Sequence, residues 1–91
     1  MIEMRCVISG VVQGVAYRAY AQDAATELGI GGFVRNMPDG TVYVLAQSPR
    51  DTLKEFVEYL NEGSSRAKVA SVAVEWGTIE TSYEDFGIVH T

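Results

Sequence analysis

The chain carries Gly10-Val11-Val12-Gln13-Gly14-Val15-Ala16-Tyr17-Arg18 between an apolar run and a segment with helical spacing. The apolar run, which includes Val7 and Ile8, predicts a strand, and the helical pattern begins near Tyr17. Residues 10–18 are therefore expected to lead from a strand to a helix N-terminus, with an arginine at the far end of the loop.

Such a loop has features that can bind an oxyanion. Gly10 and Gly14 allow backbone conformations that point successive N–H groups inward. The helix N-terminus adds unpaired donors and partial positive charge, and Arg18 adds a planar fork of donors that matches a phosphate. The alternative is a tight strand-to-helix turn with a surface arginine, and the spacing alone does not choose between the two.

Hydrophobic spacing predicts the order β-α-β-β-α-β with a short extra strand at the end. The expected strands are 4–12, 33–37, 41–47, 68–76 and 86–89, and the expected helices are 17–28 and 49–62. Ser48 is expected to cap the second helix and Pro49 to take its first position, whereas Gly31 and Gly32 are expected to keep their connection loose. This order predicts a ferredoxin-like α+β sandwich, with an antiparallel sheet and both helices on one face. We expect residues 1–91 to form one domain.

Composition narrows the classes of function. The 91 residues are 47% apolar and 21% charged, with a net charge of −5, which disfavours a general nucleic-acid binder but not a small anionic substrate. No run of about 18 apolar residues predicts a membrane span, and the N-terminus lacks the pattern of a signal peptide. The single cysteine, Cys6, lies on the apolar alternation of the first strand and is expected to be a buried hydrophobe. A cytoplasmic location fits these features.

Other proteins of this fold bind RNA or metals. An RNA-recognition domain stacks bases on aromatic side chains of its central strands; Tyr43 and Leu45 are expected on the exposed face, but their strand offers no second aromatic there. A metal site needs clustered Cys or His, and the chain has one of each. We interpret His90 as a solvated terminal side chain. Whether the Tyr43 and Leu45 face makes a dimer contact stays open.

Two segments carry a resemblance to a family. Residues 10–18 resemble the first acylphosphatase signature, a glycine and Val-Gln-Gly-Val followed by an aromatic residue and an arginine. Gly32-Phe33-Val34-Arg35-Asn36, followed by Asp39-Gly40-Thr41-Val42, resembles the second. The resemblance covers nearly the whole chain and is weaker after Ser64. It departs from the family pattern at Ser48 and Ala16, where glycine is usual or common, and at Ser64, where proline is usual.

The resemblance implies hydrolysis of acyl phosphates to a carboxylate and inorganic phosphate, with phosphate also acting as an inhibitor. It implies that Arg18 binds the phosphoryl group together with backbone N–H groups of the segment Gln13, Gly14, Val15, Ala16, Tyr17 and Arg18. It implies that Asn36 orients the attacking water, and that a monomer works without metal or cofactor. The alternative is a catalytically silent anion-binding or regulatory module of the same fold.

The residues are compatible with this chemistry. The leaving group is a carboxylate, whose ordinary pKa of about 4 lets it depart without a proton, so no general acid is needed. An asparagine before Pro38-Asp39-Gly40 is otherwise a turn-forming residue, and its place in the second signature favours the water-orienting role. Strand alternation sends Arg35 to the opposite face. Gln13 is expected to hold the loop by side-chain hydrogen bonds, and Tyr17 and Tyr20 are expected to belong to the core.

Overall fold

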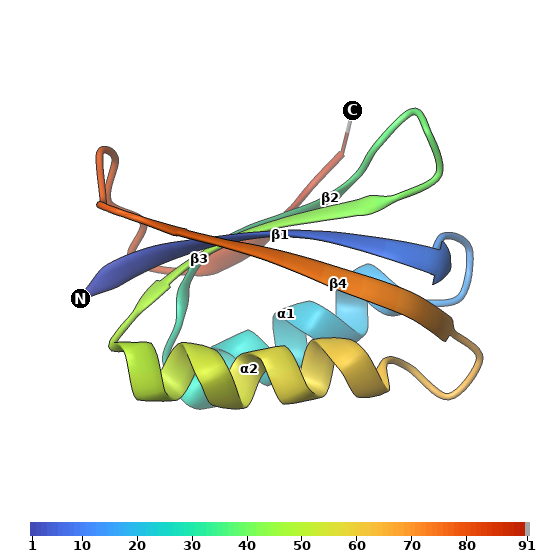
Figure 1. The fold of residues 1–91 in the computed structure, drawn as a ribbon, viewed down its shortest axis with the longest axis horizontal. Helices are drawn as coiled ribbons and strands as arrows, with labels where there is room; N and C mark the ends of the chain where they lie inside the picture. The colour runs from blue at the N-terminus through green and yellow to red at the C-terminus, as the bar shows by residue number, and fades with distance from the viewer. Residues whose placement is uncertain (91) are drawn as a thin grey trace.

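The structure is a computed structural model that describes residues 1–90. It consists of one five-stranded sheet with two helices on one face (Figure 1). The elements in chain order are β1 (Ile2–Val11), α1 (Tyr17–Leu28), β2 (Gly31–Asn36), β3 (Val42–Ser48), α2 (Arg50–Glu62), β4 (Lys68–Gly77) and β5 (Phe86–Val89).

The strand order β4-β1-β3-β2-β5 gives the ferredoxin-like arrangement that the sequence predicts. β1 pairs antiparallel with β3 and β4, and β2 pairs antiparallel with β3. The short β5 pairs parallel with β2 and extends the sheet beyond the four strands of the basic fold. The ends of β2 and β5 therefore lie next to each other, near the N-terminus of α1.

The core lies between the sheet and the helices. Alternate residues of the central strands point into this layer, and an apolar stripe on α2 faces them. These residues are fully buried: Met4, Cys6, Ile8, Val42, Val44, Ala46, Leu53, Phe56 and Leu60. Burial raises the pKa of the Cys6 thiol to about 12, so Cys6 packs as the small hydrophobe that its place in the sequence indicates.

The start of α2 differs from expectation. β3 continues through Ser48, which is buried and pairs with Ile2 of β1. Pro49, with φ −60° and ψ 149°, is the residue that caps the helix, and no side chain caps it. The prediction that Ser48 is the N-cap is wrong because sheet pairing holds Ser48 in the strand, so the chain turns into the helix only at Arg50.

The connection before β2 is also tighter than expected. Gly31 and Gly32 are buried members of β2, and they pair with Gln47 and Ala46 of β3. Gly32 has φ +143°, and a Cβ there would overlap the carbonyl oxygen of Leu45. The two glycines therefore serve close backbone approach within the sheet rather than a loose link.

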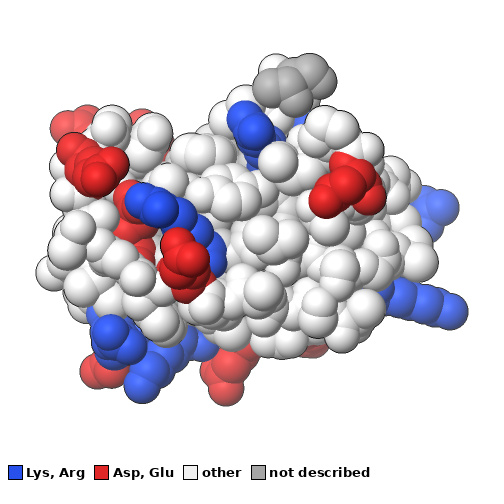
Figure 2. Space-filling model, turned by 45° about the horizontal axis from the view of Figure 1, so that its top comes forward, with Lys and Arg blue, Asp and Glu red and all other residues white. Residues whose placement is uncertain are grey.

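The face of the sheet opposite the helices has no covering layer within residues 1–90 (Figure 1). Tyr43 lies on this face, half-buried, and its ring centroid is 6.0 Å from that of Phe33 on the neighbouring β2. The neighbouring strand thus supplies the second aromatic that the sequence of β3 lacks. Seen from this side, acidic and basic side chains occur in small separate groups around an uncharged centre (Figure 2). Within residues 1–90 neither helix is both long and apolar enough to cross a bilayer.

Candidate active site

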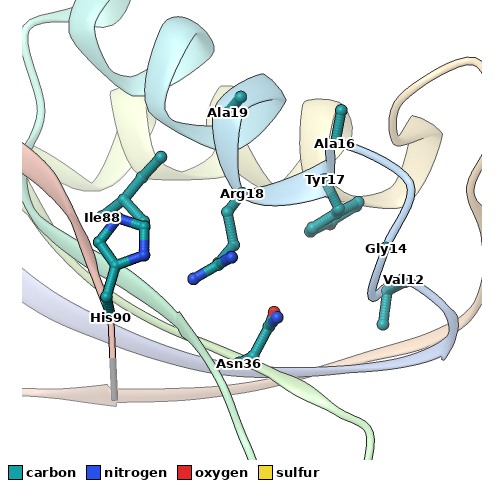
Figure 3. A pocket seen from close by; sticks show the side chains of 9 residues that line it. All are labelled: Val12, Gly14, Ala16, Tyr17, Arg18, Ala19, Asn36, Ile88 and His90. Atoms are coloured by element: carbon teal, nitrogen blue, oxygen red, sulfur yellow. The ribbon is translucent and has the colours of Figure 1, made fainter.

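A hollow of about 180 Å³ lies where the loop between β1 and α1 meets the ends of β2 and β5 (Figure 3). We call it the β1–α1 cavity, and the loop of residues 12–16 the β1–α1 loop. The cavity is lined by Val12, Gly14, Ala16, Tyr17, Arg18, Ala19, Asn36, Ile88 and His90. It therefore brings together Arg18 and Asn36, which are 18 positions apart in the sequence and lie on different elements.

The β1–α1 loop has an unusual backbone. Gly14 has φ 74°, and Ala16, which caps α1, is left-handed at φ 60° and ψ 24°. Ala16 is the one non-glycine residue with positive φ among residues 1–90. A left-handed alanine costs roughly 1–2 kcal/mol, and residues held in such conformations cluster at functional sites. The strain is thus located where the sequence predicts an anion-binding loop.

Backbone donors are available in this loop. The hydrogen bonds of the turns, loops and caps in residues 1–90 include none donated by the backbone N–H groups of residues 14–19. The first N–H of α1 to find a backbone acceptor is that of Tyr20, which donates to the Ala16 carbonyl at 3.1 Å. The unpaired groups are those that a helix N-terminus leaves free for an anion.

Two side chains brace the loop from outside. The side-chain amide of Gln13 donates to the carbonyls of Met37 at 2.9 Å and Thr41 at 2.8 Å, in the turn between β2 and β3. The Ser64 hydroxyl donates to the Val15 carbonyl at 2.8 Å. Gln13 therefore holds the loop shape, as its sequence position indicates. The side chains of Gln13 and Val15 are not among those that line the cavity.

Arg18 is the second residue of α1, is half-buried, and extends its guanidinium into the cavity (Figure 3). Its Nη1 donates to the Val89 carbonyl over 3.5 Å, which is long for a hydrogen bond. Within the described residues, no carboxylate lines the cavity. The guanidinium is therefore held in place by a weak contact and keeps donors free for a ligand.

Asn36 ends β2, and its side-chain oxygen Oδ1 is buried without a hydrogen-bond donor among the described residues. An unsatisfied buried acceptor costs about 1–3 kcal/mol, so a hydrogen-bond donor from outside the described residues would stabilise this oxygen. The neighbouring Arg35 points to the opposite face, where its Nε contacts the sulfur of Met37 at 3.3 Å. Arg35 lines a different hollow, with Phe33 and Tyr83, as strand alternation predicts.

Tyr17 and Tyr20 tie α1 to α2. The Tyr17 hydroxyl donates to the Leu60 carbonyl at 2.6 Å, and that of Tyr20 donates to the Tyr59 carbonyl at 2.8 Å. Burial raises the pKa of the Tyr17 hydroxyl above its usual range. The Tyr17 ring forms part of the cavity wall, but its hydroxyl is engaged in the core. Both tyrosines hold the two helices together, and neither offers its hydroxyl to the cavity.

The sequence interpretation missed the wall formed by Ile88 and His90. Val34 pairs with Ile88 and Arg35 with Val89 in the parallel β2–β5 ladder, and His90, which follows the last paired residue, lines the cavity with Asn36. The inward alternation of Phe86 and Ile88 is the sequence signal that could have placed His90 on the cavity side. Among residues 1–90, no group of three or more His, Cys, Asp or Glu side chains is arranged to hold a metal ion.

These features define the class of the protein, a ferredoxin-like α+β domain with a donor-lined cavity at its β1–α1 loop. Comparison with known proteins then gives the family. A family profile described as Acylphosphatase matches residues 4–88. The chain belongs to the acylphosphatase family.

Sequence relatives and solved structures support membership of this family. The chain is 44% identical over 77 residues to an acylphosphatase of Thermus thermophilus, covering 85% of this chain and 88% of that one. It is 40% identical over 90 residues to an acylphosphatase of Archaeoglobus fulgidus, covering 99% and 100%. The crystal structure of acylphosphatase from Bacillus subtilis matches with a TM-score of 0.96 at 34% identity, over 99% of this chain and 100% of that one. The activity is therefore that of an acylphosphatase, with an acyl phosphate as substrate, and a catalytically silent module is not favoured.

Proposed function

We propose that the β1–α1 cavity is the site at which the acyl phosphate is hydrolysed. Arg18 and backbone N–H groups of the segment 13–18 bind the phosphoryl oxygens, and Asn36 holds the attacking water. The observation that carries this proposal is the meeting of three features in one cavity. These are unpaired loop N–H groups, a guanidinium with free donors, and a buried amide oxygen without a partner.

The proposed step balances without an acid or base from the protein. The water oxygen forms a bond to phosphorus, and the bond from phosphorus to the acyl oxygen breaks, leaving its electron pair on the carboxylate. Both protons of the water end on the phosphate, so a phosphoryl oxygen serves as the base. The leaving carboxylate, with an ordinary pKa of about 4, needs no proton.

Each group then has a role that its chemistry supports. Phosphoryl transfer depends on positioning and on stabilisation of charge, and backbone N–H groups with a guanidinium supply the second of these. Asn36 can accept a hydrogen bond from water through Oδ1 and donate through Nδ2. As a neutral amide it does not repel the phosphoryl group, as a carboxylate would.

We also propose that inorganic phosphate competes for this cavity, since it presents the same oxygens as the substrate. The domain is also proposed to act as a monomer. A cytoplasmic location is proposed because the single cysteine, Cys6, can form no internal disulfide, which fits a reducing compartment. Analytical ultracentrifugation at assay concentration tests the monomer, and a dimer peak would contradict it.

The proposal is tested by hydrolysis of benzoyl phosphate in excess chelator, with Arg18→Ala and Arg35→Ala compared. The two arginines are a matched pair, because Arg18 lines the cavity and Arg35 lies on the opposite face. We expect Arg18→Ala to lose at least about 100-fold in kcat/KM, the usual loss for a donor to a developing oxyanion, while Arg35→Ala stays within a factor of three or so.

Other outcomes would contradict the proposal. Equal losses in both variants would mean that charge in general, rather than the cavity, supports turnover. Phosphate binding without turnover in the parent protein would support a silent module instead. Turnover that requires added metal would show that the chain's own donors do not suffice.

A further inference from the structure

His90 stands at the rim of the β1–α1 cavity and is the only histidine in the chain. It directly follows β5, whose last residue, Val89, pairs with Arg35 of β2, and it lines the same cavity as Asn36. In Figure 3 its ring and the side chain of Ile88 form the wall opposite Gly14, and Arg18 lies between the two walls. His90 is exposed to solvent, so its ring can exchange protons with water.

The groups that face His90 across the cavity determine what its charge can do. From α1, Arg18 contributes a permanent positive charge, and Tyr17 contributes a ring whose hydroxyl donates to Leu60. From β2, Asn36 contributes a neutral amide. No carboxylate of residues 1–90 lines the cavity, and Arg35 lies on the other face of the sheet. Among residues 1–90, an imidazolium here therefore has no acidic partner in the cavity lining, and Arg18 is the one other cation there.

We propose that His90 is a second anion-binding side chain of this cavity, and that its protonation strengthens the binding of a tetrahedral dianion. This inference rests on the proposed function of the cavity. Two neighbouring cations repel each other, and an anion that lies between them offsets this repulsion by attracting both. Proton uptake by His90 and binding of the anion are therefore coupled. The ligand class is a phosphoryl dianion or its analogue, held by Arg18 on one side and His90 on the other.

The solvent exposure of His90 determines how strongly its charge should change the affinity for the anion. Imidazole side chains ordinarily change charge between about pH 5 and pH 8. At an exposed rim the attraction of one added charge is screened by solvent. We therefore expect a change of about fivefold in affinity, rather than the larger change that a buried charge would give.

Sulfate is the suitable probe, because it remains a dianion throughout this range, whereas inorganic phosphate changes its own charge. The inhibition constant of sulfate against benzoyl phosphate is measured at about pH 5.5 and about pH 8, at constant ionic strength. The parent protein is compared with His90→Gln and His90→Lys. Because residue 90 is exposed, both variants are expected to fold, and thermal unfolding checks this.

The expected result is an inhibition constant about fivefold lower at the acid pH for the parent protein. The constant should be nearly independent of pH in both variants, and lower for His90→Lys than for His90→Gln. The same pH dependence in His90→Gln as in the parent would overturn the inference while leaving the cavity assignment intact. Absence of sulfate inhibition in the parent at both pH values would instead count against the proposed cavity, and would overturn this inference with it.

Discussion

The side-chain amide of Gln13 donates a hydrogen bond to the carbonyl of Thr41 at 2.8 Å, across 28 positions of sequence. A second hydrogen bond, to the Met37 carbonyl, makes this amide a clamp between the β1–α1 loop and the turn that follows Asn36. The loop proposed to bind phosphate and the strand proposed to hold water are thus held at a defined separation by one residue. In this way the geometry of the site depends on a side chain that does not line it.

Gln13→Ala should weaken both stability and turnover. It leaves two turn carbonyls without their donor, which is expected to lower the free energy of unfolding by about 1–3 kcal/mol. The loop and Asn36 would no longer be held in register, and kcat/KM should fall about tenfold or more. Urea denaturation and benzoyl phosphate kinetics measure the two effects. The matched control is Asn61→Ala, which removes one exposed amide-to-carbonyl hydrogen bond within α2 and does not touch the residues that line the cavity.

Arg18→Lys should fail to restore activity although it keeps the charge. A lysine ammonium is a point charge with a different reach, and it cannot present the planar fork of a guanidinium to two phosphoryl oxygens. We expect kcat/KM within about tenfold of that of Arg18→Ala, which is itself expected to lose at least about 100-fold. Near-parent kinetics for Arg18→Lys would show that charge alone, rather than bidentate geometry, is what the site requires.

Asn36→Ala should separate turnover from binding. If Asn36 holds the water, kcat should fall about 100-fold or more, while the inhibition constant for inorganic phosphate changes by no more than about twofold. Stability should be at least that of the parent, because the substitution removes a buried oxygen that has no donor among the described residues. A parallel loss of phosphate binding and turnover would contradict this division of roles. Thermal unfolding checks the stability.

Ala16→Gly and Gly14→Ala should move stability in opposite directions. Both positions have positive φ, and a Cβ at Gly14 would meet no atom within 4 Å, so strain rather than collision decides the outcome. Glycine at 16 should raise the free energy of unfolding by about 1 kcal/mol, and alanine at 14 should lower it by about 1 kcal/mol. Both values are measured by denaturant unfolding. A loss of stability in Ala16→Gly would mean that Ala16 makes packing contacts that outweigh its backbone strain.

Local patterns of the sequence predict much of the fold. The alternation through Met4, Cys6 and Ile8 predicts the inner face of β1, and these residues are buried. The stripe that includes Leu53, Phe56 and Leu60 predicts the buried face of α2, which is also confirmed. These predictions succeed because the period of apolar residues depends only on which local structure buries them.

The predictions that failed depend on pairing between distant segments. Ser48 looks like a helix cap, but its pairing with Ile2 keeps it in β3. Gly31 and Gly32 look like a flexible link, but they pair with β3 and sit in the sheet. A residue's preference for a cap or a turn is worth about 1 kcal/mol, and a strand ladder in which several residues take part overrides it.

The sequence by itself determined the order of elements, the inner faces of the strands and helices, and the strand-loop-helix segment that ends in Arg18. Each of these depends on residues close together in the chain. The tertiary structure alone decided that Arg18 and Asn36 face one cavity, that Gln13 clamps the loop to the turn beyond β2, and that His90 completes the wall. The physical reason is that these contacts join segments distant in the sequence, 28 positions apart for Gln13 and Thr41 and more than 50 for the parallel pairing of β2 with β5, and no local preference encodes them.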